Sequence, residues 1–175
     1  MKRLVWLQHV PVEGRGYIAD WASGQGFTGQ AVGLYAGDPL AQLIAEVLGA
    51  RVYPNAEKEI GWFPIHRPRD TEVDWLPEEA TVFHWHGDTF DLPEGVERFC
   101  SSEGCLNQAF VYQERIIGLQ FHLETTVESA RARVENGGHE RVDGPYIQDA
   151  ERLLAVNGYQ SINQIMENLL TSMTR

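Results

Sequence analysis

The N-terminal part of the chain alternates between compact apolar runs and apolar residues at helical spacing. Residues 3–10 are rich in Leu, Val and Trp and end at a proline, which predicts a buried strand followed by a loop. Residues 17–22 then follow the periodicity of a helix until Gly24. Residues 31–35 form a second apolar run closed by Gly-Asp-Pro, so the chain is predicted to open with a β-α-β unit.

The middle of the chain changes from helical to strand periodicity. Residues 41–50 place their apolar side chains on one helical face and end near a glycine, which predicts one more helix. Beyond them, β-branched and aromatic residues stand in short runs separated by Pro and Gly, a pattern typical of strands and hairpins. The strands expected in this region cover residues 81–86, 96–101, 109–112 and 116–123, the last two as a hairpin.

The last third of the sequence is predicted to be helical. Residues 125–134 open with a hydroxyl cap and Glu128 three positions later, and an Asn-Gly-Gly stretch ends them. Residues 146–156 and 161–173 follow as two amphipathic helices, the second beginning at a serine.

Charge and composition narrow the class of protein. The 175 residues carry 14 Lys and Arg against 25 Asp and Glu, a net charge of -11, and no basic cluster interrupts this acidic excess. Nucleic acid is therefore an unfavourable partner. With 43% hydrophobic residues the chain has enough apolar material for one core, so residues 1–175 are expected to form a single domain.

Signals for export or membrane insertion are weak. The first apolar run stops at Gln8, short of the roughly 7–15 residues of a signal-peptide core. No later stretch is long enough to span a bilayer. Two cysteines are too few for a disulfide framework, so the sequence predicts a cytoplasmic protein with reduced thiols and no contact with membranes.

The most chemically suggestive segment is Gly-Leu-Gln-Phe-His-Leu-Glu at residues 118–124. In a strand, Gln120, His122 and Glu124 would project from the same face. A carboxylate beside a histidine fixes the tautomer of the ring and stabilises its protonated form, as a general base requires. The alternative is a surface His and Glu at the frayed end of a strand.

A second segment, Phe-His-Trp-His-Gly-Asp at residues 83–88, puts His84 and His86 on one strand face. With His122 and Glu124 these histidines would make a donor set for iron, manganese or zinc. The alternative is one buried, hydrogen-bonded histidine and one exposed histidine.

Thiol chemistry has little support in the sequence. Cys105 lacks the cationic neighbour or helix N-terminus that lowers a thiol pKa, and Cys100 stands beside Phe99 in an apolar strand. We expect both thiols to be packed and inert.

Taken together, these segments resemble class I glutamine amidotransferases. Residues 118–124 are similar to the family signature G-x-Q-F-H-P-E, with Leu123 in place of the usual proline. Further segments resemble consecutive motifs of the family in the same order, namely residues 59–65, 84–88, 92–93, 101–102 and 107–110. Residues 7–10 and 34–40 resemble the opening strands of the stand-alone GMP synthase-like branch.

The resemblance implies a fold and roles for single residues. The fold is a flavodoxin-like three-layer α/β sandwich with a mostly parallel sheet, added β-hairpins and a helical C-terminal tail. His122 and Glu124 match two members of a Cys-His-Glu triad. Gln42 matches a substrate-holding glutamine, and His86 and Asp88 match a substrate-side loop.

The resemblance also implies ligands and partners. The ligand is glutamine or a related small amide, and neither a cofactor nor a metal is expected. The ammonia released would go to a synthetase or another acceptor enzyme as partner, and a homo-oligomer is compatible with this arrangement.

One departure from the family concerns the nucleophile. In the family, a G-x-C-x-G turn immediately precedes the helix that resembles residues 41–46, whereas here Leu40 precedes Ala41. The family would have about two βα units, roughly 60 residues, at this point. The sequence therefore predicts an internal deletion at the Leu40–Ala41 junction, no nucleophile and no glutaminase activity.

Two further interpretations remain alongside an amidotransferase-like enzyme. The chain is either a catalytically inactive pseudoenzyme or binding module, or a metal-dependent β-barrel enzyme that uses His84, His86, His122 and Glu124. The predicted helices count against the barrel.

Overall fold

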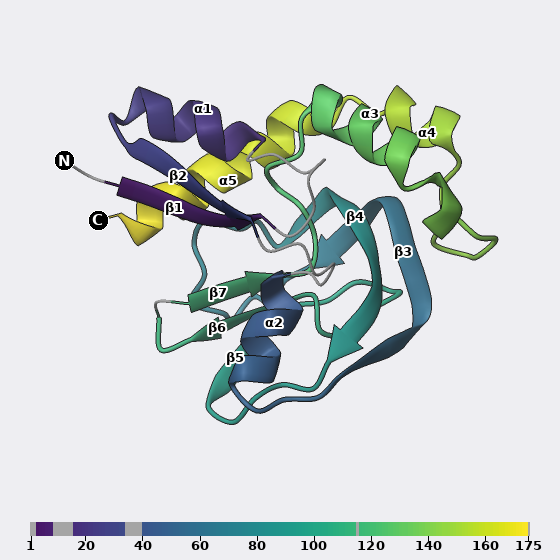
Figure 1. Ribbon diagram of the computed structural model, residues 1–175. Coiled ribbons are helices and arrows are strands. Elements are labelled where there is room, and N and C mark those ends of the chain that lie inside the picture. The colour runs from purple at the N-terminus through teal and green to yellow at the C-terminus, as the bar shows by residue number, and fades with distance from the viewer. Residues whose placement is uncertain (1–2, 9–15, 34–39, 115, 175) are drawn as a thin grey trace.

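The computed structural model describes residues 3–8, 16–33, 40–114 and 116–174 (Figure 1). Its helices are α1 (Tyr17–Gly24), α2 (Leu40–Val47), α3 (Val127–Asn136), α4 (Ala150–Ala155) and α5 (Tyr159–Met173), with a short 3-10 helix, η1, at Gly138–Glu140. Its strands are β1 (Arg3–Gln8), β2 (Thr28–Gly33), β3 (Val52–His66), β4 (Glu79–Phe90), β5 (Val96–Cys100), β6 (Ala109–Tyr112) and β7 (Ile116–Leu119). None of these helices combines the length and the apolarity needed to cross a bilayer.

The predicted β-α-β opening is present. Strands β1 and β2 pair in parallel from Arg3 opposite Thr28 to Gln8 opposite Gly33. Helix α1 connects them and lies beside α5 (Figure 1). Strand β2 begins three residues before the predicted run, and the end of that run, residues 34 and 35, lies outside the described residues.

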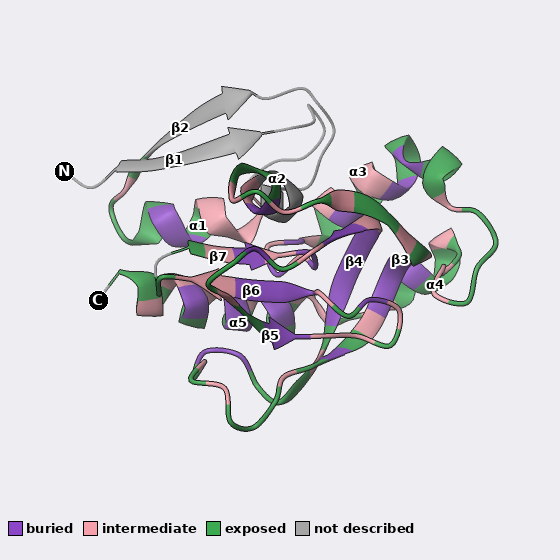
Figure 2. Cartoon of the chain, turned by 90° about the horizontal axis from the view of Figure 1, so that it is seen from below, coloured by how far each residue is buried: buried purple, intermediate pink, exposed green. Residues whose placement is uncertain are grey.

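Strands β3 and β4 form a long antiparallel hairpin at the centre of the molecule. Their register runs from His66 opposite Glu79 to Val52 opposite Phe90, with an irregularity between Pro54 and Glu59. Figure 2 shows buried residues along both strands, and also on β5, β6 and α5. Strand β4 is longer at both ends than the predicted strand over residues 81–86.

A second antiparallel sheet has the order β5-β6-β7, and α2 packs on it. The predicted hairpin is the β6–β7 pair, which turns through Gln113 and Glu114 in left-handed conformations. Strand β7 ends at Leu119 and not at Leu123 as predicted, so Gln120, His122 and Glu124 follow the strand rather than share one of its faces. Ala45 of α2, Phe90 and Phe110 are buried together on this side. Among the described residues, parallel pairing within the strands is confined to β1 and β2.

The main core is organised around Trp62 of β3. Its ring meets Phe83 and Tyr159 edge to face, with centroids 5.5 and 5.0 Å apart. Its indole N–H donates to the carbonyl oxygen of Leu153 at 3.0 Å. One aromatic side chain thereby fixes α4 and α5 on the central hairpin.

The C-terminal helices correct three predicted boundaries. Helix α5 begins at Tyr159, after Gly158, and not at Ser161. Residues 146–148 were expected to be helical but pair with β3, because the Ile60 N–H donates to the Tyr146 carbonyl and the Gln148 N–H donates to the Ile60 carbonyl. Helix α4 therefore begins only after Asp149, whose side chain caps it. The cap of α3 is Thr126, one residue later than expected, and its capping-box partner is Ser129 rather than Glu128.

Candidate functional site

His122 and Glu124 form a close pair just after the end of β7. The N–H of His122 donates to the Phe83 carbonyl at 2.8 Å, which joins this segment to β4. His122 Nδ1 lies 2.7 Å from Glu124 Oε1. The second carboxylate oxygen accepts from the Leu123 N–H at 3.1 Å, so the carboxylate is fixed at both oxygens. The side chains are 20% and 27% exposed, and solvent-borne groups can therefore reach them.

The backbone of Glu124 is held from the N-terminal side. Its carbonyl oxygen accepts from the Tyr17 N–H at 2.9 Å, at the first residue of α1. Gly16 precedes it with a φ of 48°, and a Cβ there would lie 2.0 Å from the same oxygen. Only glycine allows so close an approach in this conformation. The start of α1 thereby positions the Glu124 main chain.

His122 lowers the pKa of the Glu124 carboxyl. Burial alone would raise the pKa of the Glu124 carboxyl, but the charge of His122 and its hydrogen bond outweigh burial and lower that pKa to about 2. Glu124 is therefore an anion at neutral pH. An anionic carboxylate on Nδ1 keeps the proton of the neutral imidazole on that nitrogen and leaves Nε2 as the acceptor, which suits proton transfer.

The two thiols are placed as packed residues. Cys100 and Cys105 are 1% and 2% exposed. Burial raises the pKa of Cys100 to about 12 and raises the pKa of Cys105 above its usual value. The Cys105 sulfur lies 3.4 Å from Thr89 Oγ1 and 3.4 Å from Gln120 Nε2. Neither thiol has the environment of a nucleophile.

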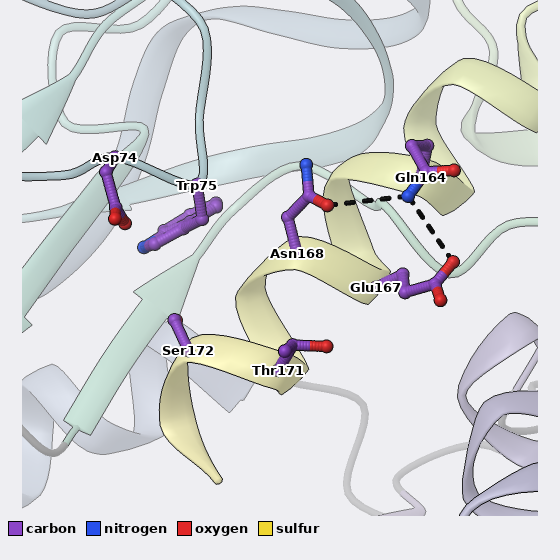
Figure 3. A pocket seen from close by; sticks show the side chains of 7 residues that line it. All are labelled: Asp74, Trp75, Gln164, Glu167, Asn168, Thr171 and Ser172. Atoms are coloured by element: carbon purple, nitrogen blue, oxygen red, sulfur yellow. Dashed lines mark hydrogen bonds between the residues drawn. The ribbon is translucent and has the colours of Figure 1, made fainter. Parts of the chain in front are cut away.

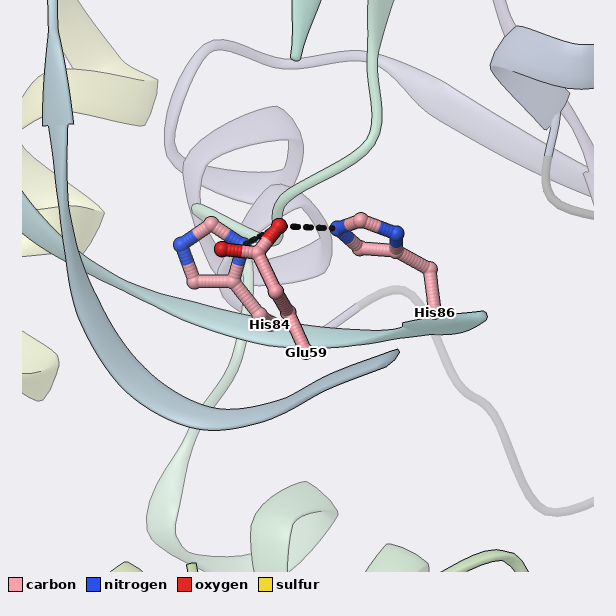
Figure 4. Close-up of side chains that lie close together, drawn as sticks. All are labelled: Glu59, His84 and His86. Carbon is pink, nitrogen blue, oxygen red and sulfur yellow. Dashed lines mark ion pairs between the residues drawn. The ribbon is translucent and has the colours of Figure 1, made fainter. Parts of the chain in front are cut away.

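A buried polar cluster lies on the β3–β4 hairpin, made of Glu59, His84 and His86 (Figure 4). Glu59 is directly opposite His86 in the register, and all three side chains are 0% exposed. Burial would raise the pKa of Glu59, but the hydrogen bond with His86 and the neighbouring imidazoles lower it. Burial lowers the pKa of His84 to about 3, so this ring is neutral at neutral pH.

Hydrogen bonds connect Glu59 to the segment after β5. Ser102 Oγ donates to Glu59 Oε1 at 2.7 Å, and Gln108 Nε2 donates to Glu59 Oε2 at 2.5 Å. Sequence reasoning did not single out Glu59 as a site residue, because a lone glutamate in an apolar strand carries no local signal. Its position opposite His86 is the signal that strand register provides.

The cluster changes the metal interpretation. Among the described residues, the potential ligands that converge are Glu59, His84 and His86. The expected four-residue set, which joined His84 and His86 to His122 and Glu124, does not converge in this way. His122 and Glu124 form their own pair instead.

The remaining predicted site residues are placed as follows. Asp88 is half-buried near the end of β4, opposite Pro54. His86 is enclosed, so it lies behind the surface rather than on it. Gln42 belongs to α2, but its side chain lies outside the described residues.

A surface pocket of about 250 Å³ lies between residues 74–75 and α5 (Figure 3). Its wall is mostly polar, and Gln164 Nε2 lies 3.4 Å from both Glu167 Oε2 and Asn168 Oδ1. The lining residues are Asp74, Trp75, Gln164, Glu167, Asn168, Thr171 and Ser172. None of the site residues predicted from the sequence lines this pocket.

Known proteins resemble the chain in sequence. The family model described as glutamine amidotransferase class-I matches residues 41–138, more than half of the chain. A glutamine amidotransferase-like protein of Salmonella typhimurium, YfeJ, is 33% identical over 141 residues, which cover 77% of this chain and 59% of that protein. A GMP synthase of Staphylococcus carnosus is 39% identical over 85 residues, 47% of this chain and 17% of that protein. The chain therefore spans only part of the length of these relatives.

Solved structures support the fold. A glutamine amidotransferase from Methylobacillus flagellatus superimposes with a TM-score of 0.88 at 21% identity, covering 99% of this chain and 94% of that one. One from Thermotoga maritima gives 0.84 at 24% identity, covering 99% and 98%. The expected flavodoxin-like α/β fold is thus confirmed, whereas the expected mostly parallel sheet is not, because the strand pairs of the described residues other than β1–β2 are antiparallel. With the family model matching from Ala41 onward, the chain belongs to the class-I glutamine amidotransferase family.

Proposed function

We propose that this protein is a glutamine amidotransferase-like domain that holds the proton-transfer half of a glutaminase site and lacks its nucleophile. In the complete reaction a cysteine thiolate attacks the side-chain amide carbon of glutamine, and ammonia leaves with a proton from the histidine. Water then hydrolyses the thioester to glutamate. The observation that carries the proposal is the 2.7 Å contact between His122 and Glu124. Both cysteines of the chain are buried, so neither offers this pair a reactive thiol.

Each retained residue has a role in this proposal. His122 is the general acid and base, and Glu124 orients it. Gln42 and Asp88 would contact glutamine or a related small amide. Because the His86 side chain is enclosed, it would hold the substrate-side loop in place rather than touch the ligand.

The absent nucleophile has a specific place in the chain. The family match begins at Ala41, directly after the junction with Leu40. We propose that the natural protein carries about 60 further residues here, two βα units that include the nucleophile turn. The alternative is a partner chain that supplies the missing strands, and the family-like segments on both sides of the junction favour the longer chain.

A partner would receive the ammonia. The GMP synthase relatives join a matching segment to a much longer protein, since the match covers 17% of the Staphylococcus carnosus enzyme. We propose an ammonia-accepting synthetase as the partner of a complete form of this protein.

The proposal is tested by ammonia release from glutamine, measured with the purified 175-residue chain and with its His122→Ala variant. Both should give the rate of the buffer blank, because members of such a triad act as a unit and the loss of the nucleophile removes several orders of magnitude in rate. A diazo-ketone glutamine analogue should likewise leave the chain unlabelled. Turnover that His122→Ala abolishes would show the proposal to be wrong.

A further inference from the structure

The cluster of Glu59, His84 and His86 leaves polar atoms unmatched in the interior. Both ring nitrogens of His84, Nδ1 of His86 and Oε1 of Gln108 are buried without a hydrogen-bond partner. A neutral imidazole always carries one N–H donor and one acceptor nitrogen. Buried polar groups are nearly always paired, and an unpaired group commonly indicates a water or an ion.

The unpaired atoms belong to a donor set typical of metals. Two neutral imidazoles and one carboxylate are the ligands of many Zn²⁺ sites and of non-haem Fe²⁺ sites. Figure 4 shows the Glu59 carboxylate between the two rings. The cross-strand pairing of Glu59 with His86 fixes this arrangement in the backbone rather than in flexible side chains.

We propose that Glu59, His84 and His86 form a buried structural site for a divalent transition-metal ion, with Zn²⁺ as the best match to the donor set. This inference does not depend on the proposed glutaminase chemistry. It revises the expectation from the sequence that the protein holds no metal.

The distances suit such an ion. The potential ligand atoms all lie within 4.8 Å of one another. Zinc bonds of about 2.1 Å in a tetrahedron place the ligand atoms about 3.4 Å apart. Glu59 Oε2 lies 3.3 Å from His86 Nε2 and 3.9 Å from His84 Nδ1. The distance to His86 already matches the tetrahedral spacing, and His84 Nδ1 would have to approach Glu59 Oε2 by about half an ångström.

Gln108 would complete the coordination. Its Nε2 lies 2.5 Å from Glu59 Oε2 and 3.3 Å from His86 Nε2, so the amide faces the site. Turning the amide over would place Oε1, which has no partner, where Nε2 now lies, at the cost of the hydrogen bond from Nε2 to Ser102 Oγ. The 2.5 Å spacing from Glu59 Oε2 would then have to open by about 0.9 Å to reach the tetrahedral value. The ion would then have one oxygen from Gln108, one from Glu59 and two imidazole nitrogens. Ser102 would continue to hold the other Glu59 oxygen.

Four protein ligands leave no open position, which is the property of a structural site. Such an ion would cross-link β3 and β4 to the segment before β6. It would also stiffen β4 next to Phe83, whose carbonyl positions the His122 main chain. The expected effect is on stability and on the alignment of the pair, not on bond cleavage.

The experiment uses the untagged 175-residue chain, dialysed against Zn²⁺ and, in parallel, against Co²⁺ as a spectroscopic probe. Elemental analysis should find one Zn²⁺ per chain, and Co²⁺ should give the intense visible absorption of a tetrahedral site. The thermal midpoint should rise with Zn²⁺ concentration, because a ligand of the folded state stabilises it.

The decisive variant is His84→Phe, which removes a ligand but fills the volume beside Phe63 and Phe121. It should bind Zn²⁺ at least about 100-fold more weakly. The matched control is His139→Gln, at an exposed histidine, which should bind like the parent chain. A folded parent chain without bound metal, or binding that survives His84→Phe, would overturn the proposal and leave a metal-free hydrogen-bond network.

Discussion

At the scale of single residues, the proposed acid-base chemistry depends on the contact between His122 Nδ1 and Glu124 Oε1. The contact is short, its carboxylate is held by a second hydrogen bond, and its main chain is fixed by the start of α1. These features hold the His122 ring in one orientation without a ligand. They also make the pair a measurable contributor to stability.

The pH dependence of stability tests this contribution. The folded-state pKa of Glu124 lies at about 2, below the ordinary value of 4.5. The unfolded chain therefore takes up this proton first, and the stabilisation present above pH 4.5 is lost as the pH falls towards 2. Urea unfolding measured across that range should show that the free energy of unfolding of Glu124→Gln falls by roughly 1–2 kcal/mol less than that of the parent chain. Glu94→Gln, at an exposed turn, should follow the parent, and identical curves for parent and Glu124→Gln would count against the pair.

The burial of the thiols gives a second prediction at this scale. In a Cys100→Ala background, which isolates Cys105, alkylation at neutral pH should be at least about 100-fold slower in the native state than in urea, because the thiol is exposed only on opening. In the Cys105→Ala variant, which isolates Cys100, alkylation should show the same difference between the native state and urea. Native Cys105 reacting faster than a free thiol would identify it as an activated nucleophile.

At the scale of elements, a glycine in β7 leaves room for a buried ring of β6, because Gly118 lies opposite Phe110. A Cβ on Gly118 would lie 2.3 Å from the ring of Phe110, which is fully buried. This close approach lets β7, the strand that leads to His122, pair with β6 inside the second sheet, where Gly118 lies opposite Phe110.

Gly118→Ala should therefore lower the free energy of unfolding by about 1–3 kcal/mol, the usual cost of overpacking. The control is Gly24→Ala at the end of α1, where a Cβ would meet no described atom within 4 Å. That change should lie within about 0.5 kcal/mol of the parent. Equal stability of the two variants in urea would refute this role of Gly118.

The sequence identified most elements, and the exceptions have physical reasons. Periodicity found α5 and the β6–β7 hairpin because these depend on local patterns. It misplaced residues 146–148, since their backbone groups are taken by Ile60, far away in the sequence. It identified His122 and Glu124, which lie two residues apart in one segment after β7, but not Glu59, which meets His86 only through strand pairing.

At the scale of the whole molecule, the strands of the described residues fall into three separate sheets. The parallel pair β1–β2 has no described strand joining it to β5, β6 and β7. A doubly wound fold requires central parallel strands, buried on both faces, to connect such parts. This division is what the absence of two βα units at the Leu40–Ala41 junction would produce.

The junction also has a consequence for behaviour in solution. Unpaired strand edges promote association with other chains. The 175-residue chain alone should therefore have low stability and a tendency to self-associate, measured by thermal unfolding and by sedimentation.

The most direct test of the account is the intact mass of the natural protein purified from its source. We predict a mass larger than 19.8 kDa, the difference being that of about 60 residues. The added segment should include a cysteine. A species of 19.8 kDa that is monomeric and unfolds cooperatively would contradict both the longer chain and the partner-supplied strands.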